Sequence, residues 1–160
     1  MSTLQVSIDV SGLGSIEALL GRLNPFQGEQ LLEALARLIR ESVRERLIAG
    51  GPSPDGAAWA PNAEGRTPIL HRSGALARSI DYAVAGSQAV IGSGLIYAAI
   101  HQFGGTIVPK SASRLAFSIG NRLIYAKKVT MPARPYIGLS ADDRAELVQA
   151  AVLYLRRLFG

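Results

Sequence analysis

The chain has 160 residues, a net charge of +5 and a hydrophobic content of 48%, a balance typical of a folded protein rather than a disordered one. It holds no cysteine and two histidines. This excludes disulfides and cysteine-based metal sites or nucleophiles, and it disfavours a histidine-rich zinc site. The chain begins without a basic segment, and it has no run of about 20 mostly apolar residues. We therefore expect neither a signal peptide nor a membrane span.

Positive charge is concentrated in the middle of the chain. Residues 49–141 carry nine Lys or Arg and three Asp or Glu, a net +6, whereas residues 1–48 carry −1 and residues 142–160 are neutral. A basic surface of this kind suits an anionic partner, and it also serves solubility. We expect a single domain over residues 1–160, built from an N-terminal strand with helices, a loop- and β-rich middle and a C-terminal helix.

The N-terminal part predicts one strand and two helices. Period-two alternation over residues 4–10 indicates a strand with one buried face. A short helix over 15–23 is expected to end at Asn24-Pro25, and a longer helix over 29–48 to end at Gly50-Gly51-Pro52. The apolar residues are Leu4, Val6, Ile8 and Val10 in the strand and Leu31, Leu35, Leu38, Ile39, Val43 and Leu47 in the long helix.

A long loop is expected over residues 50–68, because eight glycines and prolines interrupt any regular structure there. Pro54-Asp55-Gly56 is a turn sequence, since proline presets one backbone angle and glycine accepts the left-handed conformation. Long loops in compact domains are commonly functional or mobile. Trp59, the only tryptophan, is expected either to pin this loop to the core or to contact a partner.

A short helix and a hairpin come next. Ser73 has the side chain of an N-cap and is expected to open a helix over 74–79. Alternating apolar residues predict strands over 80–84 and 89–91, and Gly86-Ser87 suits the tight turn between them.

A second short helix is predicted over 96–103, with Gly104-Gly105 as its stop. An extended segment starts at Ile107, and residues 113–131 are read as a projecting β-hairpin whose tip is Gly120-Asn121. The apolar residues are Leu115, Phe117 and Ile119 in its first strand and Leu123, Tyr125 and Val129 in its second.

The chain ends with a rigid connection and a helix. Prolines stiffen the connection over 132–139, and Ser140 caps a helix over 142–160 whose first turn is acidic. The order of elements predicts an α+β fold: a mainly antiparallel sheet with helices packed on one face, a long loop and the projecting hairpin. The apolar residues Leu147, Ala151, Leu155 and Leu158 line one face of this last helix.

Catalytic chemistry has little support in the sequence. Ser73, His101 and Asp55 could be combined into a triad, but no nucleophile-elbow spacing surrounds any serine. His101 is expected to be a packed, hydrogen-bonded histidine. Adjacent helical residues do not face one another, so Asp142-Asp143 indicates a helix start rather than a metal pair. We predict no catalytic, cofactor-binding or metal-binding residue.

Nucleic-acid binding remains an alternative. Basic and aromatic residues alternate over 125–128 and 134–136, as they do on surfaces that stack single strands. Arginine dominates the basic residues, and it suits phosphate contact. Because no recognised nucleic-acid motif is present, the expected contact is non-specific, with packaged DNA as its target.

Five short motifs between Pro54 and Ser140 together resemble the phage virion morphogenesis family, whose members are tail-completion and head–tail joining components of tailed, Mu-like bacteriophages and prophages. The resemblance covers a little over half of the chain. The motifs are Pro54-Asp55-Gly56-x-x-Trp59, Leu70-x-x-Ser73-Gly74-x-Leu76-x-x-Ser79-Ile80, Ile91-Gly92-Ser93, Tyr97-Ala98-x-Ile100-His101-Gln102-Phe103-Gly104-Gly105 and Pro132-Ala133-Arg134-Pro135-Tyr136-Ile137-Gly138-Leu139-Ser140.

The resemblance implies a virion protein that binds without catalysis and without a cofactor. Such a protein would assemble in the bacterial host cytoplasm as a homo-oligomeric ring at the tail end or neck, with other tail, neck or head-connector proteins as partners. Loop 50–68 and hairpin 113–131 are expected to reach neighbouring subunits, with basic residues facing the DNA channel. The interface candidates are Trp59, Phe103, Arg114, Arg122, Lys127, Lys128, Arg134 and Tyr136.

Three functional classes thus remain open: a joining protein, a small basic nucleic-acid-binding protein and an enzyme that uses His101. Within the first class, the sequence does not separate tail completion from tail termination or a neck adaptor.

Overall fold

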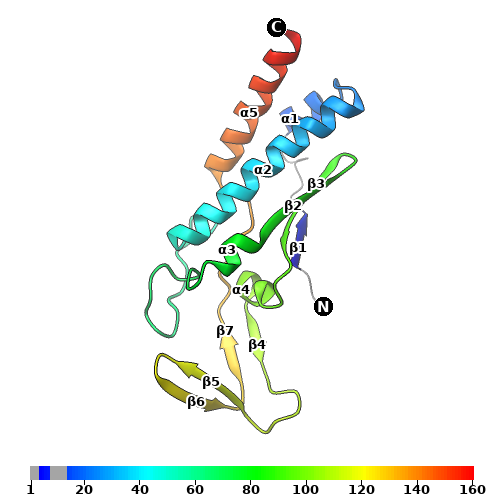
Figure 1. The fold of residues 1–160 in the computed structure, drawn as a ribbon. Coiled ribbons are helices and arrows are strands. Elements are labelled where there is room, and N and C mark those ends of the chain that lie inside the picture. The colour runs from blue at the N-terminus through cyan, green and yellow to red at the C-terminus, as the bar shows by residue number, and fades with distance from the viewer. Residues whose placement is uncertain (1–3, 8–13) are drawn as a thin grey trace.

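The computed structural model describes residues 4–7 and 14–160, and its helices and antiparallel strands confirm the α+β class (Figure 1). No helix in the described part of the chain is long and apolar enough to cross a membrane. The elements are β1 (Leu4–Ser7), α1 (Gly14–Leu20), α2 (Pro25–Ala49), α3 (Ala75–Ser79), β2 (Ile80–Ala85), β3 (Gln88–Ser93), α4 (Ala98–Phe103), β4 (Gly105–Ile107), β5 (Leu115–Ile119), β6 (Arg122–Ala126), β7 (Val129–Met131) and α5 (Ala141–Phe159).

Helix α2 begins four residues before its predicted start, and Asn24-Pro25 opens this helix instead of closing α1. The Asn24 side chain accepts a hydrogen bond from the backbone N–H of Gln27, and the Gln27 side chain accepts one from the N–H of Asn24. This capping box places Pro25 in the first turn, where its missing N–H costs nothing. Helix α1 already ends at Leu20. The predicted end of α2 is confirmed, because Gly50 adopts φ +85° and closes the helix.

Strands β1, β3 and β2 form an antiparallel sheet in that order, and α2 lies along β2 and β3 (Figure 1). Gly86-Ser87 forms the predicted two-residue turn between β2 and β3. The described part of β1 ends at Ser7, so the predicted strand residues Ile8 and Val10 lie outside the described residues. The sheet, α2 and α5 share a core that includes Leu31, Leu35, Ile39, Val43, Leu47, Ile80, Ile91, Tyr136, Leu147 and Ala151.

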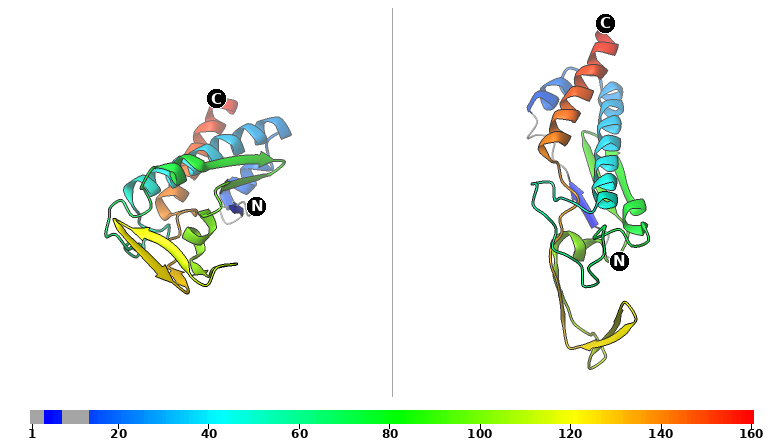
Figure 2. Two further views of the ribbon diagram at one scale, coloured as in Figure 1. Left: turned by 60° about the horizontal axis from the view of Figure 1, so that its bottom comes forward. Right: turned by 90° about the vertical axis from the view of Figure 1, so that its left-hand side faces the viewer.

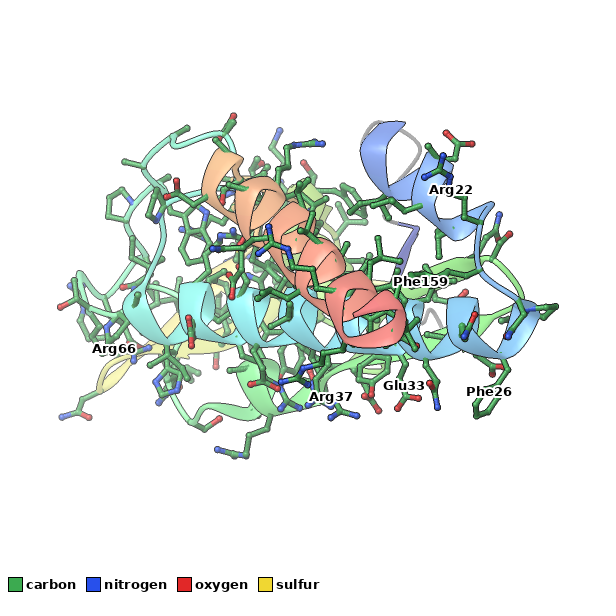
Figure 3. The ribbon with its side chains drawn as sticks, turned by 90° about the horizontal axis from the view of Figure 1, so that it is seen from above. Arg22, Phe26, Glu33, Arg37, Arg66 and Phe159 are labelled. Carbon is green, nitrogen blue, oxygen red and sulfur yellow. The ribbon has the colours of Figure 1, made fainter. Side chains whose placement is uncertain are left out.

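Helix α5 crosses α2 (Figure 3), and a buried ion pair joins the two helices. The Arg46 Nη2 lies 2.8 Å from the Asp143 Oδ2, and the two side chains are 8% and 10% exposed. Arg46 also donates to the carbonyls of Tyr136 and Gly138, at 2.8 and 3.3 Å. One guanidinium thus holds together α2, the connection before α5 and the first turn of α5.

Asp143 is at once an ion-pair partner and part of a helix cap. Its Oδ2 accepts from the Ser140 N–H at 2.7 Å, while the Ser140 Oγ accepts from the Asp143 N–H at 3.1 Å, which confirms Ser140 as the cap of α5. The Ser42 hydroxyl also donates to Asp143. Burial alone would raise the pKa of Asp143, but the hydrogen bonds from Ser42 and Ser140 and the charge of Arg46 outweigh it and hold this pKa below its usual value.

The remaining strands leave the helical body and form two further two-stranded sheets. All strand pairs are antiparallel, as expected, but they form three sheets where the sequence suggested one. β4 pairs with β7, and β5 pairs with β6 through the predicted Gly120-Asn121 turn. Val129 was predicted in the hairpin but belongs to β7, opposite Ile107, because Lys127-Lys128 carry the chain out of the β5–β6 ladder. We call residues 105–131 the arm, which projects from the body in two views (Figure 2).

The two short helices begin later than predicted. The N-cap of α3 is Gly74, in the left-handed conformation, rather than Ser73. The Ser73 hydroxyl still accepts from the Ala75 N–H at 3.3 Å, so it supports the start of the helix from one residue upstream. Helix α4 starts at Ala98 instead of residue 96 and ends, as predicted, at Gly104.

Candidate assembly interface

A groove of about 860 Å³ separates the arm from the body. Its walls come from residues 61–76, from α4 and from strands β4, β5 and β7. Most of the residues that line the groove are apolar, and the lining also includes the charged residues Glu64, Arg66, Arg72 and Arg134. The apolar residues along the groove are Ile69, Leu70, Leu76, Ile107, Leu115, Phe117, Ile119, Val129 and Met131.

Loop 50–68 is fastened to the connection that precedes α5. The Trp59 Nε1 donates to the Pro135 carbonyl at 2.9 Å. The Arg134 guanidinium donates to the carbonyls of Ala60 and Pro61 at 2.7 and 2.8 Å, and burial lowers the pKa of Arg134. The loop was expected to reach a neighbouring subunit, but its Trp59 segment is packed against its own chain.

Gln102 on α4 acts as a bridge to the same connection. Its side-chain oxygen accepts from the backbone N–H groups of Tyr136 and Ile137, at 2.9 and 3.0 Å, and its amide nitrogen donates to the Ile137 carbonyl at 3.1 Å. The Tyr136 hydroxyl returns to α4 and donates to the Ala98 carbonyl at 2.9 Å. Burial raises the pKa of Tyr136 far above its usual value. The buried Gln102 amide thus satisfies backbone N–H and carbonyl groups of the connection, as a neighbouring strand would do in a sheet.

Gly104 explains why the motif needs a glycine after α4. The residue has φ +68°, and a Cβ there would lie 2.7 Å from the Ala133 nitrogen and 2.8 Å from the Met131 carbonyl oxygen. A side chain would therefore push the base of the arm away from the connection.

Glu64 closes the groove at the tip of the β5–β6 hairpin. The Gly120 N–H donates to the Glu64 Oε1 at 3.2 Å, and the Arg66 guanidinium donates to the other carboxylate oxygen. The hydrogen bonds from Arg66 and Gly120 lower the pKa of Glu64 below its usual value. This contact, which we call the latch, joins the arm tip to the loop.

Replacing Glu64 by alanine is expected to loosen the hairpin tip. The Gly120 amide then loses its acceptor, so its hydrogen exchange, measured by NMR, should accelerate several-fold while α2 amides stay unchanged. Glu45→Ala is the matched control, because Glu45 is exposed on α2 and has no ion pair among residues 4–7 and 14–160. Equal exchange at Gly120 in both variants would show that the latch does not hold the tip.

Comparison with protein families matches residues 13–156 to the sequence model of the phage virion morphogenesis family. The match covers nearly the whole chain. The chain belongs to this family. It is therefore a virion-associated protein with a structural or assembly role in the phage particle.

Two relatives come from Mu-like phages. The putative capsid assembly protein G of Escherichia phage Mu is 43% identical over 82 residues, which cover 51% of this chain and 43% of the Mu protein. The Mu-like prophage FluMu G protein 2 of Haemophilus influenzae is 26% identical over 156 residues, which cover 96% of this chain and 98% of that protein. The chain thus aligns with less than half of the Mu protein's length. No solved structure matches the chain.

The structure divides the predicted interface residues of this phage protein into a buried and an exposed group. Trp59, Arg134 and Tyr136 are 6%, 3% and 0% exposed, so in the single chain they support the loop and the connection, and we do not propose them as partner contacts. Phe103 is 65% exposed at the end of α4. The other exposed candidates are Arg114, Arg122, Lys127 and Lys128.

The residues of the hypothetical triad do not act on one another. The Asp55 carboxylate accepts from the Ala57 N–H at 3.1 Å within its own turn. Ser73 and His101 both line the groove, but no hydrogen bond joins them in the described part of the chain. Within residues 4–7 and 14–160, no three His, Asp or Glu side chains gather where they could hold a metal ion.

His101 is packed as predicted, but its side chain makes no hydrogen bond within residues 4–7 and 14–160. Its ring meets the Tyr97 ring edge-on, with centroids 5.9 Å apart, and its Nδ1 is buried without a partner among these described residues. Burial, and then the charge of Arg134, lower the pKa of His101. The imidazole is thus neutral near pH 7 and serves as a wall of the groove.

Sequence reasoning missed the residues that position this site. Glu64 is one of three acids in the basic middle, and a lone acid among cations is a recognisable signal for an ion pair. Gln102 carries no such signal, because a glutamine on a short helix is usually exposed. Arg46 falls in an ordinary row of helical charges, and nothing in the spacing distinguishes it from Arg37.

Proposed function

We propose that this chain completes the phage tail and joins it to the head, as a ring of identical subunits at the tail end or neck. It acts there by binding, without catalysis. The observation that carries the proposal is the arm: in a member of a virion morphogenesis family, it extends from the body with unpaired strand edges and exposed apolar side chains.

The arm supports subunit contact in two ways. Within residues 4–7 and 14–160 its two sheets have two strands each, so each strand leaves one edge unpaired there, and such edges accept strands from other chains. Its β6 strand exposes Leu123 and Tyr125 on one face, at 59% and 61%, and aromatic residues are favoured anchors of protein interfaces. A neighbouring virion protein would cover both features.

The relatives are consistent with a position between head and tail. The name of the Mu relative refers to capsid assembly, which suggests contact with the head. The exposed arm suits contact between the subunits of a ring. A ring at the neck would make both contacts, with the head and between its own subunits. A joining protein would be made in the host cytoplasm and retained in the finished virion.

Electron microscopy of a lysate from a phage or prophage that lacks this gene tests the proposal. The expected image shows filled heads lying apart from tails of full length. Tails of abnormal length, or no tails, would show that the protein acts in building the tail rather than in joining it to the head. Normal joined particles would contradict the joining function and favour the nucleic-acid alternative.

DNA contact is a second proposed property of the arm. Lys110, Arg114, Arg122, Lys127 and Lys128 are exposed on it, and none pairs with a carboxylate within residues 4–7 and 14–160. Unpaired cations attract DNA phosphates without reading sequence. In a ring, these residues would face the channel through which packaged DNA passes.

Charge reversal of Arg122, Lys127 and Lys128 to glutamate is expected to reduce DNA delivery while joined particles still form. Like charges along the channel would then repel DNA. Particle counts by microscopy and DNA entry into host cells are measured on the same preparation. Unchanged delivery would exclude the lining role, and a steep salt-dependent DNA shift by the isolated chain would instead favour a nucleic-acid-binding protein.

A further inference from the structure

The β5–β6 hairpin has two strand edges that nothing in the chain protects. Proteins usually protect edge strands with charged side chains, prolines, bulges or short length. Residues 115–119 contain no charge and no proline, residues 122–126 carry a charge only at Arg122, and the five residue pairs of the ladder run without a bulge. Within residues 4–7 and 14–160, no backbone group of either strand bonds outside the hairpin. Both edges are therefore free to pair with a further strand.

The edge strand β2 shows the contrast. It carries Asp81 within the strand, and this carboxylate accepts a hydrogen bond from the Tyr82 N–H at 2.9 Å. The Arg44 guanidinium donates to the Ile80 carbonyl at 2.9 Å. Strands β4 and β7 have only three residues each. The hairpin thus holds edges that are more open to another chain than those of β2, β4 and β7.

The two edges of the hairpin have different surroundings. All five residues of β5 line the groove, whereas no residue of β6 does so among the described residues. Side chains alternate between the faces of a strand, so five consecutive residues line a groove only along the strand's edge. Figure 1 shows β6 on the side of the hairpin away from the body. A five-residue strand fills about 800 Å³ at normal strand and sheet spacings, and the groove, at about 860 Å³, has that room.

The exposed face of the hairpin has large side chains on β6 and small ones on β5. Leu123 and Tyr125 of β6 are 59% and 61% exposed, and their partners across the ladder are the exposed Ser118 and Ala116 of β5. A second β5 strand beside β6 would set another row of small side chains against Leu123 and Tyr125 and would cover them from the open side. Pairing between two like edges would leave the other edge of each hairpin uncovered.

We propose that β6 of one copy pairs with β5 of the next copy, in the groove, so that the hairpins form one antiparallel sheet from subunit to subunit. Copies related by rotation about a ring axis keep the direction of their hairpins along that axis. Strand β6 therefore meets its neighbour's β5 in antiparallel orientation. The contact is head-to-tail, and such contacts form a ring when the rotation between copies closes. This inference rests on the proposed ring and assigns its subunit joint.

Charge opposes this joint. At the base of the hairpin, Lys127 and Lys128 of one copy come beside Arg114 of the next, and at the tip Arg122 comes beside the latch, whose carboxylate already has a cation. Backbone hydrogen bonds and apolar contacts must therefore hold the joint, and DNA in the channel would offset the repulsion. Because salt screens like charges, the contact is expected to strengthen as the salt concentration rises.

The absence of cysteine from the chain permits a direct test by crosslinking. Ser118→Cys marks β5 and Leu123→Cys marks β6. A phage or prophage that lacks the gene is supplied with both single variants together, and its particles are treated with a short bismaleimide. Covalent dimers are expected from the mixture only, because a head-to-tail joint does not bring two like edges together. The control mixture is Ala57→Cys with Leu123→Cys, since Ala57 is exposed but lies outside the groove.

Infectious particles that give no dimers, or no more than the control mixture, would overturn the inference and leave the joining function intact. Dimers from either variant alone would also overturn it, because they indicate a two-fold contact between like edges. If the variants do not restore joined particles, dimer formation in a mixture of the purified variants decides the inference. If the wild-type chain does not restore them either, the proposed function is contradicted.

A charged side chain on β6 provides a second test in the same mixture. Adding Tyr125→Lys to the Leu123→Cys chain is expected to reduce the dimer yield about tenfold, because lysine on an edge strand opposes pairing. Ala83→Lys is the control, since Ala83 is exposed on the edge strand β2, and it should leave the yield unchanged. A yield that Tyr125→Lys does not lower, or that falls as the salt concentration rises, would contradict strand pairing.

Discussion

Replacing Arg46 by alanine is expected to lower the free energy of unfolding by about 3–5 kcal/mol, because it leaves the Asp143 carboxylate buried without its cation. Both side chains are nearly enclosed, at 8% and 10% exposed, so water cannot replace the lost partner. The carbonyls of Tyr136 and Gly138 also lose their donor. Urea unfolding followed by circular dichroism measures the change.

Arg37→Ala provides the matched control. Arg37 lies on the same helix and pairs with Glu33 at 3.3 Å, but these side chains are 60% and 52% exposed. Exposed pairs of this kind contribute about 0–1 kcal/mol. If the two variants had equal stability, the ion pair between α2 and α5 would not be a main fastening of the fold.

The same cluster predicts a pH dependence of stability. The pKa of Asp143 is lower in the folded chain than in the unfolded chain. Its contribution is therefore fully present above the ordinary aspartate pKa of about 4, and it is lost as the pH falls through the lower, folded value. Asp143→Asn should flatten the acid limb of a stability–pH curve, and an acid limb equal to that of the wild type would contradict this assignment.

Replacing Gln102 by leucine is expected to cost about 3–6 kcal/mol, although leucine is similar in volume. The N–H groups of Tyr136 and Ile137 and the Ile137 carbonyl would lose their partners inside the protein, and each unsatisfied buried group costs about 1–3 kcal/mol. The connection that carries the arm and α5 would lose its attachment to α4. Thermal or urea unfolding measures the loss.

Gln149→Leu is the control for that substitution, since Gln149 is exposed on α5. Its effect should stay within about 0.5 kcal/mol. A small loss in both variants would show that the connection is held without the Gln102 amide.

Local signals sufficed for much of the fold. The apolar stripe of α2, the Gly86-Ser87 turn, the Gly120-Asn121 turn and the Ser140 cap are each determined by neighbours in the sequence. The start of α2 was misplaced because proline both ends one helix and begins another, and only the Asn24 capping box decides between the two. The family was also recognisable from motif order.

Long-range pairing could not be predicted in the same way. Val129 continues the period-two pattern of β6, yet it pairs with Ile107 across the arm, and a period does not identify a partner strand. The burial of Trp59 and Arg134 depends on the carbonyls of Pro135, Ala60 and Pro61, which no side-chain pattern reveals. Aromatic and arginine residues anchor interiors as well as interfaces, so residue type alone did not separate the two.

The central claim is that this chain joins heads to tails, and complementation in vitro tests it most directly. Purified protein is added to an extract of induced cells that lack the gene, and plaque-forming particles are counted. Infectivity is predicted to appear in proportion to the protein added, as filled heads acquire tails. If the extract stays non-infectious after folded protein is added, although an extract of wild-type cells restores infectivity, the joining function would be contradicted.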